Sequence, residues 1–183
     1  MELEERAKSV AEEVLSESLP RRWKHVQSVA GKARAIARLV PEPEQQVLIA
    51  AAWLHDVGYA PGIVSTGLHA LDGARWLRRH HMHDRIVGLV AYHSCALFEA
   101  AERGLEEQLR SEFRDEESPL RDALWYADMT TGPDGQDLDV SERLAEIRSR
   151  YGPEHVVTRF WVRGEPYLIA AVRRTEKRLA GEA

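Results

Sequence analysis

The sequence has very little cysteine and no long apolar run. Its single thiol, Cys95, cannot form a disulfide within the chain, which is consistent with a reducing compartment. The start of the chain, Met1 to Arg6, lacks the basic segment and apolar run of a secretory signal. No apolar stretch approaches the roughly 20 residues that a membrane helix needs. We therefore expect a cytoplasmic protein with no membrane partner.

An excess of positive charge is also absent. The 183 residues include 25 Lys and Arg against 30 Asp and Glu, which gives a formal net charge of -5. A general binder of nucleic acid polymers needs a basic face that neutralises phosphates. The sequence therefore argues against a nucleic acid polymer as partner. A phosphorylated small molecule would have to meet local positive charge from metal ions or from a few Arg and Lys side chains.

Low-complexity segments and long linkers are missing as well. With 44% hydrophobic and 30% charged residues, the composition is that of an ordinary globular protein. A chain of this length fits one domain, which buries about 70% of its unfolded surface. We expect residues 1–183 to form that single domain, and the sequence leaves the oligomeric state open.

What the sequence does contain is apolar residues at helical spacing. Between about residues 21 and 41 they repeat at steps of three and four, which predicts a helix with His25 at the edge of its buried face. Residues 46–55 are apolar nearly all round, which predicts a central helix surrounded by others. Gly58 is expected to end that helix as a left-handed cap. The dipeptide His55-Asp56 then lies in or just after the last turn.

The next segments also predict helices. Ser65–Gly67 is expected to cap a helix that carries His69 in its first turn. A helix that begins near residue 84 has an apolar stripe that His93 extends, so His93 should point inward. Residues 98–113 predict one acidic helix.

The last third of the chain has clear helix starts. Ser118-Pro119 begins a helix that places Asp128 on an apolar stripe. Asp139–Glu142 has the pattern of a capping box, and Pro153 is expected to begin the last helical region. No segment predicts a strand. The expected fold is all-α, a single-domain helical bundle that the helices between residues 139 and 180 complete.

Six histidine and aspartate residues stand out from these patterns. Imidazole nitrogens and carboxylate oxygens are borderline and hard ligands that can share one divalent ion. An aspartate on an apolar helix face needs a partner, because burying an unpaired carboxylate is costly, and a metal ion can be that partner. We therefore expect a metal centre formed by His25, His55, Asp56, His69, His93 and Asp128.

The order of these residues resembles the motif of the HD-domain superfamily of metal-dependent phosphohydrolases. Four positions match that family's ligand motif: His25, His55, Asp56 and Asp128. Two more resemble the histidines of its dinuclear branch: His69 and His93. The similarity spans residues 25–128 and implies a helical bundle of the HD-domain type with phosphohydrolase activity. One departure is Tyr59, which stands where many hydrolytic relatives place a Lys or another polar residue.

Six ligands suffice for two metal ions if Asp56 bridges them. The first ion would take His25, His55, Asp56 and Asp128, and the second His69, His93 and the Asp56 bridge. This ligand set favours iron or manganese, with cobalt, nickel, zinc and magnesium as alternatives. We expect Asp56, His69 and His93 to be catalytic. A metal-bound hydroxide would then attack a phosphate ester or phosphoanhydride of a nucleotide-like small molecule.

Several alternatives stay open on the sequence alone. His69 or His93 could contact a substrate phosphate in an enzyme with one metal ion. The same ligands in HD-type relatives can hold two irons that activate dioxygen, and an intact pocket could also serve a non-catalytic nucleotide-binding protein. Arg21, Arg22 and Lys24 flank His25 and are candidate phosphate contacts, against the simpler interpretation that they are solvated helix charges.

Other polar and reactive residues are assigned no chemistry. Three histidines lie among charged residues in a predicted turn between helices: His80, His81 and His83. Three aspartates lack the spacing of a calcium loop and fit turns and a helix cap: Asp134, Asp137 and Asp139. The five tryptophans lie mostly at helical core positions, and Cys95 has no base partner in the sequence.

Overall fold

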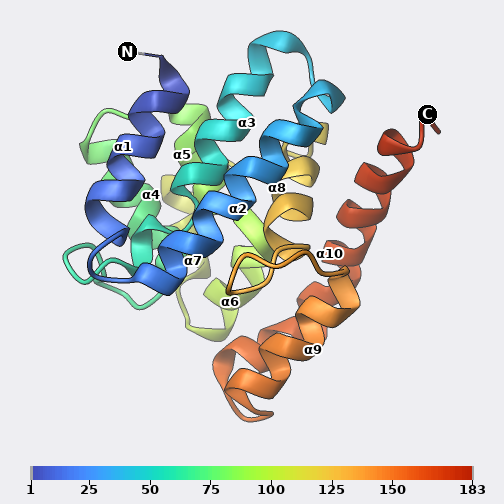
Figure 1. Ribbon diagram of the computed structural model, residues 1–183. Coiled ribbons are helices and arrows are strands. Elements are labelled where there is room, and N and C mark those ends of the chain that lie inside the picture. The colour runs from blue at the N-terminus through green and yellow to red at the C-terminus, as the bar shows by residue number, and fades with distance from the viewer. Residues whose placement is uncertain (1, 183) are drawn as a thin grey trace.

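The computed structural model describes residues 2–182, and every regular element in that range is helical. The all-α fold class is therefore confirmed. The first helices are α1 Leu3–Leu15, α2 Pro20–Ile36, α3 Glu42–Leu54, α4 His69–Arg79 and α5 Asp84–Ala91 (Figure 1). The later helices are α6 Ala96–Glu102, α7 Glu106–Glu112, α8 Pro119–Met129, α9 Val140–Tyr151 and α10 Val156–Leu179. Three short 3-10 helices join them: η1 Ala37–Leu39, η2 Val57–Tyr59 and η3 His93–Cys95.

Helix α3 is the central helix that the apolar run predicts. All residues from Val47 to Leu54 are buried, because α1, α2, α5 and α8 surround the helix. A helix that is apolar on every side can only be stable in such a position. The end of α3 consequently delivers His55 and Asp56 into the interior of the bundle.

The prediction that Gly58 ends α3 as a left-handed cap is wrong. Gly58 lies inside η2, and it is absent from the glycines of positive φ in the described chain. Because Gly58 has no side chain, it allows η2 and α4 to pack closely against each other. A Cβ atom at this position would lie 1.9 Å from the carbonyl oxygen of His69 and 2.7 Å from the backbone nitrogen of Gly73. Only glycine therefore lets α4 pack against the segment that follows Asp56.

The expected cap at Ser65–Gly67 is also wrong, because the hydrogen bonds run in the opposite direction. Helix α4 begins at His69 after Leu68, and no side chain caps it. The carboxylate of Asp72 instead accepts backbone N–H bonds from Ser65, Thr66 and Gly67 at 2.9–3.1 Å. A buried aspartate of the first turn thus fixes the preceding loop and places His69 at the start of the helix.

Two further boundaries differ from the sequence prediction. The acidic helix predicted over residues 98–113 is interrupted by Gly104 at φ +69°, which separates α6 from α7. His93 does not extend the stripe of α5, because that helix ends at Ala91 and His93 begins η3. His93 is nevertheless buried, as expected, with 2% of its surface exposed.

Helix starts with polar caps agree with the sequence. The hydroxyl of Ser118 accepts the Arg121 N–H at the start of α8, and Asp139 with Glu142 forms the expected capping box of α9. The prediction that Pro153 begins the last helix is wrong, because α10 begins later in the chain, at Val156.

Helices α9 and α10 form one end of the molecule and a wall beside the central helices. Figure 1 shows α9 and the first half of α10 extending beyond α6, while the rest of α10 runs along α8. Their apolar side chains build a second core with α8, around Trp125, Ile147 and Trp161. No helix within residues 2–182 combines the length and apolar character that crossing a bilayer requires. The expected domain of residues 1–183 includes residues 1 and 183, which lie outside the described range, so its extent stays a prediction.

Candidate metal centre

The fold brings all six of the expected ligand residues together. They come from helix α2, the end of α3, the start of α4, η3 and α8, so segments far apart in the chain meet at one place. They form two groups, and within each group the ligand atoms lie within 4.8 Å of one another. The first group is His25, His55 and Asp128. The second group is Asp56, His69 and His93.

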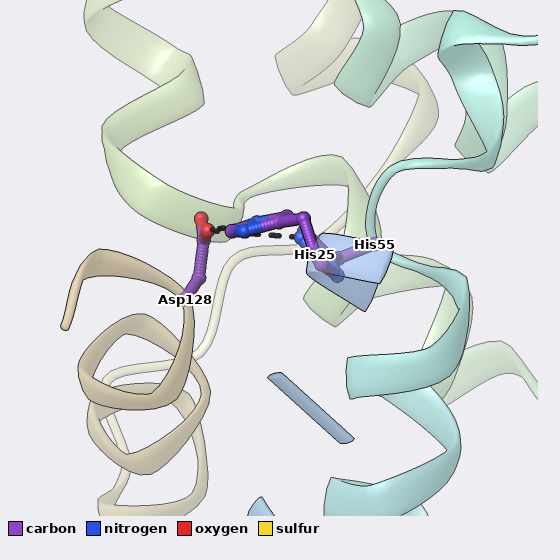
Figure 2. A group of neighbouring side chains, drawn as sticks. All are labelled: His25, His55 and Asp128. Carbon is purple, nitrogen blue, oxygen red and sulfur yellow. Dashed lines mark hydrogen bonds and ion pairs between the residues drawn. The ribbon is translucent and has the colours of Figure 1, made fainter. Parts of the chain in front are cut away.

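The first group is deeply buried and points at one carboxylate. The Nε2 atoms of His25 and His55 lie 3.1 and 3.7 Å from Oδ1 of Asp128. Figure 2 shows both imidazole rings directed toward the Asp128 carboxylate. The three residues are at most 6% exposed, so water does not compete freely for these atoms. The other oxygen of Asp128, Oδ2, accepts a hydrogen bond from the Ser94 hydroxyl.

Asp56 lies between the two groups, with one oxygen facing each. Its Oδ1 is 3.6 Å from Nε2 of His69 and 3.9 Å from Nε2 of His93. Its Oδ2 is 3.4 Å from Nε2 of His55 and 3.9 Å from Nε2 of His25. A carboxylate in this position has the geometry that a bridging ligand needs, because each oxygen can serve a different group.

Backbone carbonyls fix the orientation of three of the histidines. The Nδ1–H groups of His25, His55 and His93 donate to the carbonyl oxygens of Gly132, Ala52 and Val90 at 3.0, 2.8 and 2.6 Å. Because the proton sits on Nδ1, the lone pair of Nε2 faces the centre. This arrangement is typical of metal-ligating histidines, whose second nitrogen is held by a hydrogen bond.

The surroundings of one buried nitrogen atom, Nε2 of His55, indicate whether a metal ion fits this site. Nε2 of His55 is fully buried and has no hydrogen-bond partner among residues 2–182. Leaving a buried polar atom unsatisfied costs about 1–3 kcal/mol, so native structures avoid it unless another group satisfies the atom. In the neutral form of His55 this atom carries a lone pair, and the carboxylate oxygens and imidazole nitrogens around it complete a set of ligands that fits a divalent ion.

The charges of the site favour ionised carboxylates. Burial favours the neutral form of Asp56, but the Arg22 guanidinium and His55 together hold the pKa of Asp56 well below its usual range. Burial likewise opposes ionisation of Asp128, and His55 and His25 outweigh it and lower the pKa of Asp128. Both side chains therefore offer full negative charge to a cation.

The histidines of the site differ in the direction in which their pKa values are shifted. Burial lowers the pKa of His69, with His93 adding to the effect, and burial and His55 lower the pKa of His93. These imidazoles are therefore neutral, as a ligand must be. Burial also opposes a charged His55, but Asp56 and Asp128 outweigh it and raise the pKa of His55 to about 9. Without a metal ion, His55 consequently holds a proton at neutral pH.

Arg22 and Tyr59 complete the surroundings of Asp56. The guanidinium of Arg22 donates to Oδ2 of Asp56 at 2.6 Å and lies 3.8 Å from the centre of the Tyr59 ring. That ring in turn stacks on His69, with 4.1 Å between ring centres. Tyr59 itself carries no positive charge, and Arg22 supplies that charge beside Asp56 from a different helix. The sequence contains a signal for Arg22, since it lies one helical turn before His25.

A strained turn positions His93 and Ser94. Ser94 and Cys95 are consecutive non-glycine residues at φ +44° and +64°, in the left-handed region. The turn directs His93 and Ser94 toward the metal-ligand groups, while the Cys95 thiol donates to the carbonyl oxygen of Gly164 on α10. Sequence patterns do not reveal Ser94, because no periodicity describes such a turn.

A narrow pocket of about 70 Å³ opens from the second group toward α9 and α10. Arg22, Arg143 and Arg150 line it, together with the aromatic rings of Tyr151 and Trp161. Arg143 is buried, and its Nε atom has no hydrogen-bond partner in the described chain. The sequence reasoning missed Arg143 and Arg150, because nothing local connects α9 to the histidines.

The proposed substrate contacts Arg21 and Lys24 lie outside this pocket. Arg21 pairs with Asp134 at 2.7 Å and lines a neighbouring hollow of about 280 Å³ that also includes His25. Lys24 is exposed on α2. Their role in substrate binding stays a prediction.

Residues assigned no chemistry lie away from the two groups. His80, His81 and His83 are exposed around the turn between α4 and α5. Asp134 pairs with Arg21, Asp137 pairs with Lys32, and Asp139 caps α9. The Cys95 thiol is buried, and burial raises its pKa, so it is poorly suited to be a nucleophile.

Comparison with known families agrees with this geometry. The HD domain family model matches residues 22–146, which include all six ligand residues. The chain belongs to the HD domain family, whose members are mostly metal-dependent hydrolases that bind divalent metals. Helix α10 lies beyond the matched residues. Neither a curated protein nor a solved structure matches the chain.

Proposed function

We propose that this protein is a metal-dependent phosphohydrolase that cleaves a phosphate ester or phosphoanhydride of a nucleotide-like small molecule. The observation that carries the proposal is the position of Asp56 between two groups of ligand atoms, with the Arg22 guanidinium 2.6 Å away. Ligands for two cations and a cationic side chain meet at one pocket, which is the combination that a phosphoryl group requires.

The ligand assignment follows the geometry of the two groups. His25, His55, Asp128 and Oδ2 of Asp56 would hold one ion, and His69, His93 and Oδ1 of Asp56 would hold the other. Iron or manganese suits this mixture of imidazole and carboxylate best. When bound, the ions would supply Lewis acidity and an activated water for attack on phosphorus.

The arginines are the second part of the proposal. Arg22, Arg143 and Arg150 line both the narrow pocket at the ligand groups and the neighbouring hollow on α2. Guanidinium groups bind phosphoryl oxygens in pairs of parallel hydrogen bonds. We propose that the narrow pocket takes the reacting phosphoryl group. The rest of the substrate would extend over Arg21 in the larger hollow.

No covalent enzyme intermediate is part of this proposal. The Cys95 thiol faces α10 and is buried, with its pKa raised, and the site histidines are directed at the ligand groups. A side-chain nucleophile would need a free base beside it. Oxygen from solvent should therefore enter the released phosphate.

The test begins with anaerobic purification and elemental analysis. The metal found is then restored to the protein during a phosphate-release screen over mononucleotides, dinucleoside polyphosphates and cyclic dinucleotides. Release of phosphate that disappears in Asp56→Ala and persists in His81→Ala is the expected result. Metal binding without any turnover would support a nucleotide-binding protein instead. Oxygen consumption with substrate cleavage would move the protein to the di-iron oxygenases.

A further inference from the structure

A second and larger cavity lies apart from the metal-ligand groups. Its volume is about 680 Å³, within the range of small-molecule sites, and it opens between α6, α8 and α10. Among the described residues, its lining shares no member with that of the narrow pocket at Asp56. Its inner end reaches Cys95, which directly follows the turn that carries His93 and Ser94.

The cavity is rich in guanidinium groups, although the whole chain is acidic. Five arginines line it against four carboxylates: Arg110, Arg121, Arg163, Arg174, Arg178, Glu106, Asp115, Glu117 and Asp122. Arg174 and Arg178 share one buried carboxylate, that of Asp122, at 2.7 and 3.1 Å. Arg110 pairs with Glu106, and Arg121 pairs with Asp115. The exposed Arg163 has no ion pair within residues 2–182, so the positive charge that protein carboxylates leave uncompensated is that of Arg163.

Aromatic rings lie directly beside these charges. The Phe98 and Tyr167 rings are 5.0 Å apart, and the Arg163 guanidinium lies 5.8 Å from the Phe98 ring centre. Tyr167 is 61% exposed at this wall. A flat ring placed against Phe98 and Tyr167 would cover exposed aromatic surface and bring its substituent to Arg163.

The inner wall of the cavity is formed by two stacked side chains, Arg121 and Trp125. The Arg121 guanidinium lies 4.8 Å from the Trp125 ring centre, and the side chain is 10% exposed and pairs with Asp115. Nε of Arg121 and Nε1 of Trp125 are fully buried, so a ligand in the cavity does not reach them. The charge that a ligand can reach therefore lies at the entrance, at the exposed Arg163.

We propose that this cavity is a second ligand site, which binds a small aromatic anion. The ring of the ligand lies against Phe98 and Tyr167, and its anionic group contacts Arg163 at the entrance. An aromatic ring without an anionic group would leave Arg163 without a counterion, and a small anion without a ring would leave the Phe98 and Tyr167 rings uncovered. The site is independent of the metal centre and of the reaction proposed for it.

The fluorescent aromatic sulfonate 1-anilinonaphthalene-8-sulfonate is a suitable probe. The folded protein should bind it saturably with one site per chain, and 2-naphthoate should displace it. Neutral 2-naphthylmethanol and inorganic phosphate should not displace it at the same concentration. Removal of metal with a chelator should leave the binding unchanged, because no metal ligand lines this cavity.

Exposed residues of α10 supply matched variants. Arg163→Gln and Tyr167→Ala should each weaken probe binding by about tenfold, the usual effect of losing a charge-assisted contact or a stacking partner. Arg173→Gln and Val162→Ala lie on the same helix, are exposed and do not line the cavity, so they should bind as the parent does. Equal binding by all four variants, or displacement by phosphate alone, would overturn the proposal.

Discussion

The guanidinium of Arg22 donates a 2.6 Å hydrogen bond to the Asp56 oxygen that faces His55 and His25. Arg22 therefore does two things at once. It keeps the carboxylate ionised, and it stands at the wall of the pocket where a phosphoryl group would lie. A cation beside a metal ligand weakens metal binding through repulsion, so its presence is better explained by an anionic substrate.

Replacement of Arg22 tests this relationship. Arg22→Ala should lower kcat/KM by about 10–100-fold, the usual cost of losing a charge-assisted hydrogen bond to a phosphoryl group. Most of the loss should appear in KM, and Arg22→Lys should recover part of it because a single charge remains. The control is Arg38→Ala, an exposed arginine outside the pocket. Steady-state kinetics of the three variants measure kcat and KM. An unchanged KM in Arg22→Ala would show that Arg22 does not bind the substrate.

Loss of single ligands should remove metal ions in steps. Asp56→Ala should lose both ions and turnover together, because its two oxygens face different groups. His69→Ala should retain one ion, since the first group of ligands stays intact. Elemental analysis after gel filtration counts the ions, with His81→Ala as the surface control. Equal metal content in Asp56→Ala and the parent protein would contradict the bridging assignment.

Metal affinity should depend on pH through His55. A ligand imidazole must be neutral, whereas Asp56 and Asp128 raise the pKa of His55 to about 9 against the effect of burial. Below that pH the metal ion displaces a proton, so affinity should rise about tenfold per pH unit between pH 7 and 9 and then level off. Calorimetry in buffers of different ionisation enthalpy measures the released proton. No release at pH 7.5 would show that His55 is already neutral.

Alanine substitutions at Gly58 and Gly62 should have different effects on the free energy of unfolding. Gly58→Ala places a Cβ atom 1.9 Å from the His69 carbonyl oxygen, so α4 must shift, and we expect a loss of about 2–3 kcal/mol in the free energy of unfolding. Gly62→Ala has no neighbour within 4 Å of the added Cβ atom and should change stability by less than about 0.5 kcal/mol. Urea unfolding of both variants provides the comparison. Similar stability of the two variants would mean that η2 and α4 are not in close contact.

The Cys95 thiol should react slowly in the folded protein. It is buried, and burial raises its pKa, so little thiolate is present near neutral pH. A thiol-specific disulfide reagent should label it slowly at pH 8 and rapidly after unfolding in guanidinium. Cys95→Ala should keep the proposed phosphohydrolase activity. Loss of activity with an unchanged circular dichroism spectrum would point to a thiol role that the geometry does not support.

The sequence by itself determined the all-α class, the positions of several helices and the identity of the candidate ligands. Apolar spacing showed that α3 is surrounded by other helices, and the His55-Asp56 pair at its end had to enter the interior. Caps at Ser118 and Asp139 fixed the starts of α8 and α9. These features depend on residues within a few positions of each other, and local spacing is what a sequence displays directly.

The tertiary structure decided how those residues combine. His25 and Asp128 meet although they are 103 positions apart, and the Arg22 guanidinium comes to lie 2.6 Å from the Asp56 carboxylate. Gly58 acts through contact with α4, and Arg143 reaches the pocket from α9. Such contacts depend on how helices cross in three dimensions. A pattern along one chain does not encode that crossing, because each helix face can pack against several partners.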